Sequence, residues 1–325
     1  MIKFSITLTG AVLCLTLGCT KTLPSANSDA KTADPVSVQL NWYAEAEHGG
    51  VYQARADGTY DESNLKVEIR PGGRATPVAA EVVMGRASFA ITNADDVVLY
   101  RAAGSDIVAL TAAMQDNPRC IMVRKDSGVT TWEGLKGMTL QRQEGQGFVE
   151  FLRANGTLEG VQEVPYNGFA NLVTDPKIAV QAYSFAEPFL VQEAGAEVTT
   201  MMVSDLGWNP YSSVLVTRGD LVRNNPELVK RFVEATRTGW RHYLSEPAKG
   251  NQAILAANQH GMTLAALEFG STSLVELARP DDMPLEEVGK MTAERWKALV
   301  EQMSKLKLIP AGSVKAEECF TEQFL

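Results

Sequence analysis

Apolar and polar residues alternate in several short runs from residue 36 onward, as they do in strands with one buried face. These runs predict strands over 36–40, 65–69, 87–92, 107–114, 138–140, 178–184 and 213–217. Longer stretches with helical start and stop residues predict helices over 48–57, 78–84, 148–154, 225–244 and 292–306. Strands that alternate with short helices imply βαβ units and open, mainly parallel sheets flanked by helices, which is an α/β fold.

Two local signals refine the helix starts. Thr76 followed by Pro77 is typical of an N-cap with proline in the first turn, and Thr130 with Glu133 fits a capping box. Pro188, directly after Glu187, marks another helix start.

The alternation of predicted strands and helices is interrupted twice along the chain, and these interruptions predict two lobes. A second lobe begins near Asn117-Pro118, and the chain returns to the first lobe near residues 207–210. We therefore expect a first lobe of residues 36–116 and 208–325, and a second lobe of residues 117–207.

The N-terminus has the pattern of an export signal. Lys3 precedes a short apolar stretch over 6–17, which is too short to span a bilayer. Gly18 before Cys19 is typical of a bacterial lipoprotein signal, although such signals prefer leucine where Thr16 stands. We expect a signal peptide over 1–18, a lipid on Cys19 and a flexible tether over 19–35; a plain secretory signal is the alternative.

Charge and cysteine content exclude several classes of protein. A net charge of −9 without basic runs predicts no nucleic-acid partner. The three histidines and the absence of CxxC spacing make a metal centre improbable, and no common enzyme motif is present. After Cys14 and Cys19, only Cys120 and Cys319 remain, which could form a disulfide; the apolar run around Cys120 favours a buried thiol.

Candidate binding residues lie where strands end, because ligands of open α/β sheets bind beyond the carboxyl ends of the strands. This rule selects Asn41, Trp42 and Asn93, and proximity to the first strand's end adds Glu47 and His48. Aromatic residues at the expected inter-lobe edges add further candidates, namely Tyr183, Trp208 and Tyr211.

Glu187 is the most specific candidate. A carboxylate only accepts hydrogen bonds, so among aromatic walls it suits an amino-substituted heterocycle or a cation. Equally, glutamate is favoured at a helix N-terminus without any ligand. The nearby acids argue against nitrate, sulfonate or phosphate as the solute, since anion sites need donors.

Residues 40–54, LNWYAEAEHGGVYQA, resemble the opening of the thiamine-pyrimidine-precursor family. That family contains bacterial solute-binding lipoproteins and the fungal thiamine pyrimidine synthase. Residues 135–137, 185–188 and 225–229 resemble the wider superfamily of sulfonate, nitrate and pyrimidine binders. The resemblance covers roughly residues 36–247 and implies the two-lobed type II periplasmic-binding-protein fold.

The resemblance also allows the catalytic residues of the synthase members to be compared with this chain. Synthase members use a lysine that bears pyridoxal phosphate, a nearby histidine and a cysteine-rich motif. At the matching positions this chain has Asn93, Val97 and residues 209–213, NPYSS. These departures favour a binder over an enzyme.

The resemblance thus implies a monomeric solute-binding protein without a cofactor. Its partners would be an ABC permease and ATPase, with a lipid anchor on the periplasmic or outer side of a bacterial membrane. The expected solute is a thiamine pyrimidine precursor or a related amino-heterocycle. A pyridoxal-phosphate-dependent synthase and a binder of riboflavin or a sulfonate remain alternatives.

Overall fold

The computed structural model describes residues 1–2, 5 and 32–325. Cys19, nearly all of the predicted signal peptide and most of the predicted tether lie outside the described residues. Residues 33–325 form one compact unit. Among the helices described, none is both long and apolar enough to cross a membrane.

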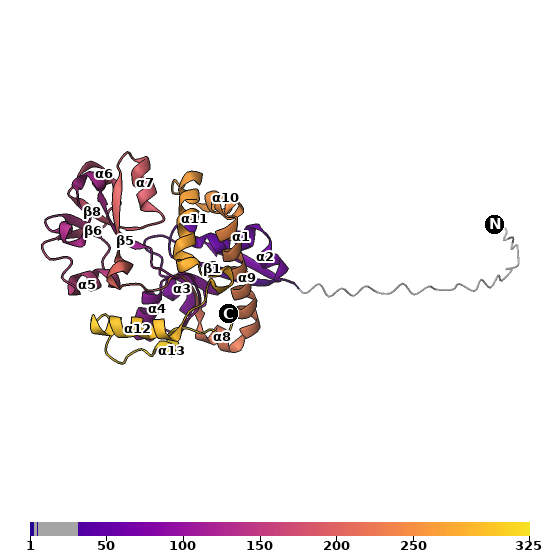
Figure 1. The fold of residues 1–325 in the computed structure, drawn as a ribbon. Helices are drawn as coiled ribbons and strands as arrows, with labels where there is room; N and C mark the ends of the chain where they lie inside the picture. The colour runs from indigo at the N-terminus through magenta and orange to yellow at the C-terminus, as the bar shows by residue number, and fades with distance from the viewer. Residues whose placement is uncertain (3–4, 6–31) are drawn as a thin grey trace. The chain divides into compact units, whose positions relative to one another are not determined.

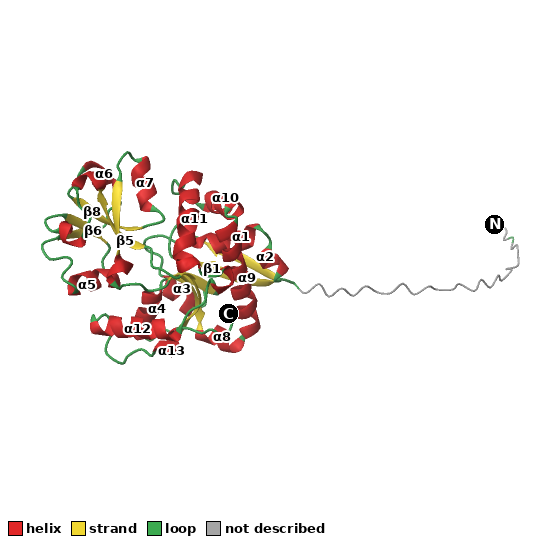
Figure 2. Ribbon diagram, in the orientation of Figure 1, coloured by secondary structure: helices red, strands yellow, loops and turns green. Residues whose placement is uncertain are grey.

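The described residues contain ten strands in two five-stranded sheets with helices on both faces (Figures 1 and 2). The first sheet comprises β1 (Asp34–Gln39), β2 (Leu65–Arg70), β3 (Phe89–Thr92), β4 (Ile107–Met114) and β10 (Ser212–Arg218). The second comprises β5 (Arg119–Arg124), β6 (Thr139–Arg142), β7 (Gln162–Pro165), β8 (Ile178–Tyr183) and β9 (Val198–Met202).

The helices lie between and after these strands. The α-helices are α1 (Gly49–Ala56), α2 (Thr59–Glu62), α3 (Val78–Val83), α4 (Ala94–Ala102), α5 (Gly147–Ala154), α6 (Ala170–Thr174), α7 (Glu187–Glu193), α8 (Gly219–Asn224), α9 (Pro226–Ser245), α10 (Ala248–Ala257), α11 (Leu264–Ala278), α12 (Ala293–Lys305) and α13 (Ala316–Cys319). The 3₁₀ turns are η1 (Ala46–His48), η2 (Lys125–Ser127), η3 (Trp132–Leu135), η4 (Val203–Leu206), η5 (Pro280–Asp282) and η6 (Leu285–Glu287).

Each sheet has four strands in one direction and one reversed strand. The first sheet has the order β2-β1-β3-β10-β4, with β10 antiparallel to both neighbours. The second has the order β7-β6-β8-β5-β9, with β5 antiparallel to both neighbours. The prediction of mainly parallel sheets is confirmed.

The reversed strands are the ones that follow the two crossings between the sheets, after β4 and after β9. Asn117 joins the crossings: its N–H donates to Asn209 Oδ1 at 2.7 Å, and its Nδ2 donates to Pro210 O at 2.9 Å. Arg295 of α12 donates to a backbone carbonyl in each crossing, Gln115 O and Asn209 O. These bonds hold the crossings together where the two sheets meet.

Close helix packing supports the outer face of the first sheet. Helix α1 packs against α9 and α10, and Figure 1 shows these helices on the side of β1. A Cβ at Gly50 would lie 2.2 Å from the Trp240 ring, so only glycine allows this approach. The short distance between α1 and α9 fixes the loop that precedes α1.

Most predicted elements exist, with shifts at their ends, but two start signals are wrong. The turn after Thr130 is the 3₁₀ helix η3, with Thr131 at its N-cap and no side-chain capping bond. Pro77 rather than Thr76 occupies the N-cap of α3. The prediction also lacks β5, β7 and β9; residues 120–123 of β5 are all buried, so they do not alternate.

Candidate functional site

A cavity of about 650 Å³ is lined by residues from both sheets and the loops that follow their strands. On the side of the first sheet the walls include Asn41, Trp42, Glu45, Glu47, Thr92, Asn93 and Asp96. On the side of the second sheet they include Arg119, Arg142, Gln146, Tyr166, Gln181, Tyr183 and Glu187. A volume of this size is typical of small-molecule sites.

The loop after β1 places Trp42 on the wall. The Gly72 N–H donates to Trp42 O at 2.8 Å, and a Cβ at Gly72 would lie 2.2 Å from Leu40 O. Glycine at this position therefore allows the 71–73 turn to lie directly against the end of β1. The half-buried Trp42 indole lies 5.2 Å from the Tyr43 ring, so an aromatic face is held beside the cavity.

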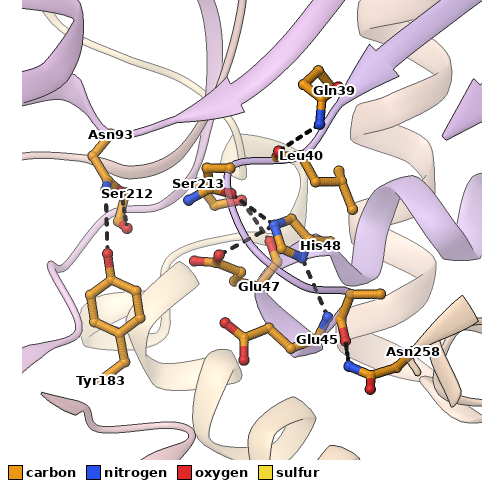
Figure 3. Close-up of polar contacts among 12 residues, drawn as sticks. Gln39, Leu40, Glu45, Glu47, His48, Asn93, Tyr183, Ser212, Ser213 and Asn258 are labelled. Atoms are coloured by element: carbon orange, nitrogen blue, oxygen red, sulfur yellow. Dashed lines mark hydrogen bonds and ion pairs between the residues drawn. The ribbon is translucent and has the colours of Figure 1, made fainter. Parts of the chain in front are cut away.

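A chain of hydrogen bonds joins the two sides of the cavity. Ser212 Oγ donates to Asn93 Oδ1 at 2.6 Å, and Asn93 Nδ2 donates to Tyr183 Oη at 3.2 Å (Figure 3). Asn93 is the N-cap of α4, directly after β3, and Tyr183 ends β8. Burial raises the pKa of the Tyr183 phenol, so the phenol stays protonated near neutral pH.

Arg119 is a cavity residue that the sequence interpretation missed. Its Nη2 donates to Tyr183 Oη at 3.1 Å, and its guanidinium lies 4.3 Å from the centroid of the Tyr183 ring. With Asn93 and Arg119 both donating, the two lone pairs of the Tyr183 oxygen are used and its hydrogen remains free to donate. The only signal for Arg119 in the sequence is its position directly after Asn117-Pro118, where the chain crosses to the second sheet.

Four glutamates line the cavity, and three of them lie close together: two after β1 and one at the start of α7. Glu187 Oε2 accepts the Tyr183 N–H at 2.8 Å, and burial raises the pKa of its carboxyl. Burial, followed by the charges of Glu47 and Glu187, raises the pKa of Glu45 well above its ordinary value. These causes show that the three acids share one electrostatic environment.

Glu47 is the most enclosed of these acids. Its side chain is 1% exposed, and neither carboxylate oxygen has a hydrogen-bond partner among the described residues. The nearest basic atom is His48 Nε2, 3.2 Å from Glu47 Oε1. A buried carboxylate without donors is costly, so this group is suited to a ligand that supplies them.

His48 does not line the cavity but contacts residues that do. Its imidazole is fully buried, with Nε2 2.9 Å from Asn41 Oδ1 and Nδ1 accepting the Glu45 N–H at 3.4 Å. The backbone donor at Nδ1 assigns the ring proton to Nε2, where it faces Asn41 and Glu47. Figure 3 shows this arrangement, with the carboxylates of Glu45 and Glu47 turned toward the side where Tyr183 lies.

The structure separates the nine ligand-contact candidates into two groups. Asn41, Trp42, Glu47, Asn93, Tyr183 and Glu187 line the cavity, whereas His48, Trp208 and Tyr211 do not. Trp208 is buried in the core against Phe151, with ring centroids 5.7 Å apart. Tyr211 is buried beside Trp296, and its hydroxyl accepts the Thr292 N–H at 3.1 Å.

Neither a metal ion nor pyridoxal phosphate fits the described residues. Within the described part of the chain, no group of three or more histidine, cysteine, aspartate or glutamate side chains could hold a metal ion. No lysine is among the described residues that line the cavity, so the lining does not fit pyridoxal phosphate held as a Schiff base.

The two five-stranded sheets, with a cavity lined by residues from both, form a fold of the periplasmic-binding-protein type. A solved structure with this fold is the periplasmic aliphatic sulphonate binding protein SsuA from Escherichia coli. It has a TM-score of 0.67 and 14% identity, covering 88% of this chain and 91% of that chain. The chain belongs to the NMT1/THI5-like family, which it matches over residues 45–250.

The relatives of this chain are named for different ligands and activities. The riboflavin-binding protein RibY of Chloroflexus aurantiacus is 22% identical over 100% of this chain and 99% of the relative. The 4-amino-5-hydroxymethyl-2-methylpyrimidine phosphate synthase of Legionella pneumophila is 22% identical over 89% and 92%. The formylaminopyrimidine-binding protein of Halalkalibacterium halodurans is 23% identical over 84% and 86%.

Proposed function

We propose that this chain is the extracytoplasmic solute-binding lipoprotein of an ABC importer, and that it binds a thiamine pyrimidine precursor or a related amino-heterocycle. The observation that supports this most directly is the set of acceptor-only carboxylates beside the aromatic walls of the cavity. An amino group on a flat ring supplies the donors that these carboxylates lack, and the ring can stack on an indole. The pyrimidine-binding relative is consistent with this chemistry.

In this proposal the two lobes, residues 36–116 with 208–325 and residues 117–207, close on the solute. The crossings joined by Asn117 serve as the hinge. Trp42 stacks on the ring, Asn93 bonds to its edge, and Glu187 accepts from its amino group. Affinity then comes from enclosure and hydrogen bonding, without any reactive group.

The same proposal places the protein at the membrane surface, where it delivers the solute to a permease driven by an ATPase. Cys19 would be the lipidated first residue of the mature chain. We expect mass spectrometry of membrane-extracted protein to find a diacylglycerol on Cys19. A soluble mature protein with a free N-terminus elsewhere would show that the lipid anchor is wrong.

The binding assignment is tested by Glu187→Gln. Because Glu187 Oε2 accepts the Tyr183 N–H, the introduced amide keeps its oxygen there and turns its NH₂ toward the cavity. A ligand amino group then meets a donor, and loss of a charge-assisted bond costs about 1.5–3 kcal/mol, or about tenfold to hundredfold in affinity. Trp42→Ala should weaken binding by a comparable factor through lost stacking area.

Calorimetric titration with 4-amino-5-hydroxymethyl-2-methylpyrimidine measures both effects. Glu193→Gln, an exposed change on the same helix, is the matched control and should bind like the parent. Thermal melting checks that all variants are folded. If Glu187→Gln binds as tightly as the parent, Glu187 only begins α7 and the site assignment fails.

Riboflavin is the second candidate solute, favoured by the size of the cavity and by the full-length similarity to RibY. A thermal-shift screen with pyrimidines, flavins and sulfonates distinguishes these solutes. Absorbance after incubation with pyridoxal phosphate tests the synthase alternative, since a specific Schiff base fixed by borohydride to one lysine of this chain would favour an enzyme.

A further inference from the structure

Three of the acidic residues that line the cavity come from its two opposite sides. Glu45 and Glu47 come from the segment between β1 and α1, whereas Glu187 begins α7 next to the second sheet. Each lines the same cavity, and the charges of Glu47 and Glu187 both act on Glu45. The result is one acidic region shared by the two sides.

Three arginines also line the cavity, namely Arg74, Arg119 and Arg142, and the guanidinium of Arg74 lies 5.1 Å from the centroid of the Tyr166 ring. Within residues 32–325, no arginine or lysine forms an ion pair with Glu45, Glu47 or Glu187. Arg119 donates to Tyr183 and Gln146 instead, and Arg142 pairs with Glu163 at 2.8 Å. The basic atom nearest to Glu47 is His48 Nε2, which also faces Asn41, and the charge of Arg119 opposes the rise in the pKa of Glu187.

Glu47 supplies an independent observation. Its side chain is 99% buried on the wall of the cavity, and neither of its oxygens receives a hydrogen bond from the described residues. A neutral amino group could satisfy one acceptor. It would not offset the burial and the mutual repulsion that raise the pKa of Glu45 and of Glu187.

Resting on the proposed function, we infer that the solute is bound as a cation: an amino-heterocycle whose ring is protonated or permanently charged, placed against Glu45, Glu47 and Glu187. A positive ring offsets the mutual repulsion of the carboxylates as well as supplying donors. Solutes of the same shape without charge are then rejected by electrostatics rather than by size.

The size of this preference follows from the charges. An opposite charge within about 4–6 Å shifts the pKa of a titrating group by about 1–3 units toward its charged form. For a ligand this equals a preference of about 10-fold to 1,000-fold for the cation over its neutral counterpart, before the cost of removing the cation from water. We expect at least tenfold in the parent protein.

The test compares two matched probes at pH 8. One is 4-amino-2-methylpyrimidine, which is neutral, and the other is its ring-N-methylated pyrimidinium, which is permanently charged and is tried as both ring isomers. Calorimetric titration gives the affinity ratio of cation to neutral probe. Taking this ratio cancels any effect that weakens the binding of both probes equally, including partial unfolding of a variant.

In the parent we expect the pyrimidinium to bind at least tenfold more tightly. Glu45→Gln and Glu47→Gln should each lower the ratio by about tenfold, whereas Glu193→Gln, with the same change in net charge, should leave it unchanged. Equal binding of the two probes, or a ratio that both cavity variants leave intact, overturns the cationic solute but not the proposed function. If neither probe binds, both the proposed function and this inference fail.

Discussion

The start of α4 makes the stability of the ligand-free protein depend on pH. Asp95 and Asp96 are adjacent at the first turn of this helix, beside Asn93. Burial, followed by the charge of Asp96, raises the pKa of Asp95 from 3.8 to about 7, although Arg119 opposes the change. The pKa of Asp96 is also raised, chiefly by burial.

The direction of the effect follows from proton linkage. A carboxyl whose pKa is higher in the folded protein binds its proton more tightly there than in the unfolded chain. Its contribution to stability is therefore complete below about pH 4 and is lost as pH rises through about 7. Carboxyls with lowered pKa, such as Asp106 and Glu163, lose their contribution only on acidification below their ordinary pKa.

The magnitude can be bounded for Asp95. Each pKa unit corresponds to about 1.36 kcal/mol, so a rise from 3.8 to about 7 corresponds to at most about 4 kcal/mol. Water reaches the partly exposed carboxyl, and Asp96 competes for the same proton, so we expect about half of this. From pH 5.5 to about 7 the effect covers about 1.5 pKa units, or about 2 kcal/mol before this reduction, so the parent should lose about 1 kcal/mol of unfolding free energy from this residue between pH 5.5 and pH 8.

Urea denaturation of the ligand-free protein at the two pH values measures the loss, and Asp95→Asn removes the titrating group while keeping an acceptor. We expect the variant to lose about 1 kcal/mol less than the parent, with Asp205→Asn, an exposed change, behaving like the parent. Histidines also change charge in this range, so the difference between parent and variant is the decisive quantity. Equal pH dependence in the two proteins would refute the reasoning.

Two further predictions concern packing. Gly50→Ala should destabilise the protein by about 1–3 kcal/mol in a denaturation assay, because the new Cβ would lie 2.2 Å from the Trp240 ring; an unchanged unfolding free energy would contradict the α1–α9 contact. Cys120 and Cys319 are free and buried, with Sγ atoms that donate to Ala182 O and Lys315 O. Alkylation followed by peptide mapping should find both thiols unmodified in the native protein and both labelled after denaturation without reductant, whereas a disulfide-linked peptide pair would disprove this.

The predicted and the missed cavity residues differ in the direction of their strands. Trp42 and Asn93 follow the carboxyl ends of parallel strands, which is where ligand sites of open sheets are expected. Arg119 begins β5, which runs antiparallel to β8, so its register partner is Tyr183 at the far end of that strand. The amino end of a reversed strand thus lies at the same edge, and only the sheet order shows which strand is reversed.

The aromatic residues show a second limit of sequence reasoning. Trp208 and Tyr211 lie in the second crossing, close to the cavity along the chain, but they face the core and α12. A crossing has no periodicity that distinguishes its two sides. Glu187, in contrast, begins α7 and also lines the cavity, and its role as an acceptor for a ligand stays a prediction.

The hydrogen-bond partners of the charged residues in the cavity, rather than the number of acids, disfavour an anionic solute. Arg119 also lines the cavity and could contact an anion, which the sequence interpretation did not anticipate. However, its Nη2 donates to Tyr183 and Gln146, and its guanidinium lies against two aromatic rings, so it is held in place as part of the wall. Glu47 has no such partners. Because the buried Glu47 carboxylate lacks donors among the described residues and Arg119 is already engaged, the part of the cavity beside Glu47 favours donors and positive charge, whereas Arg74 lies against the Tyr166 ring.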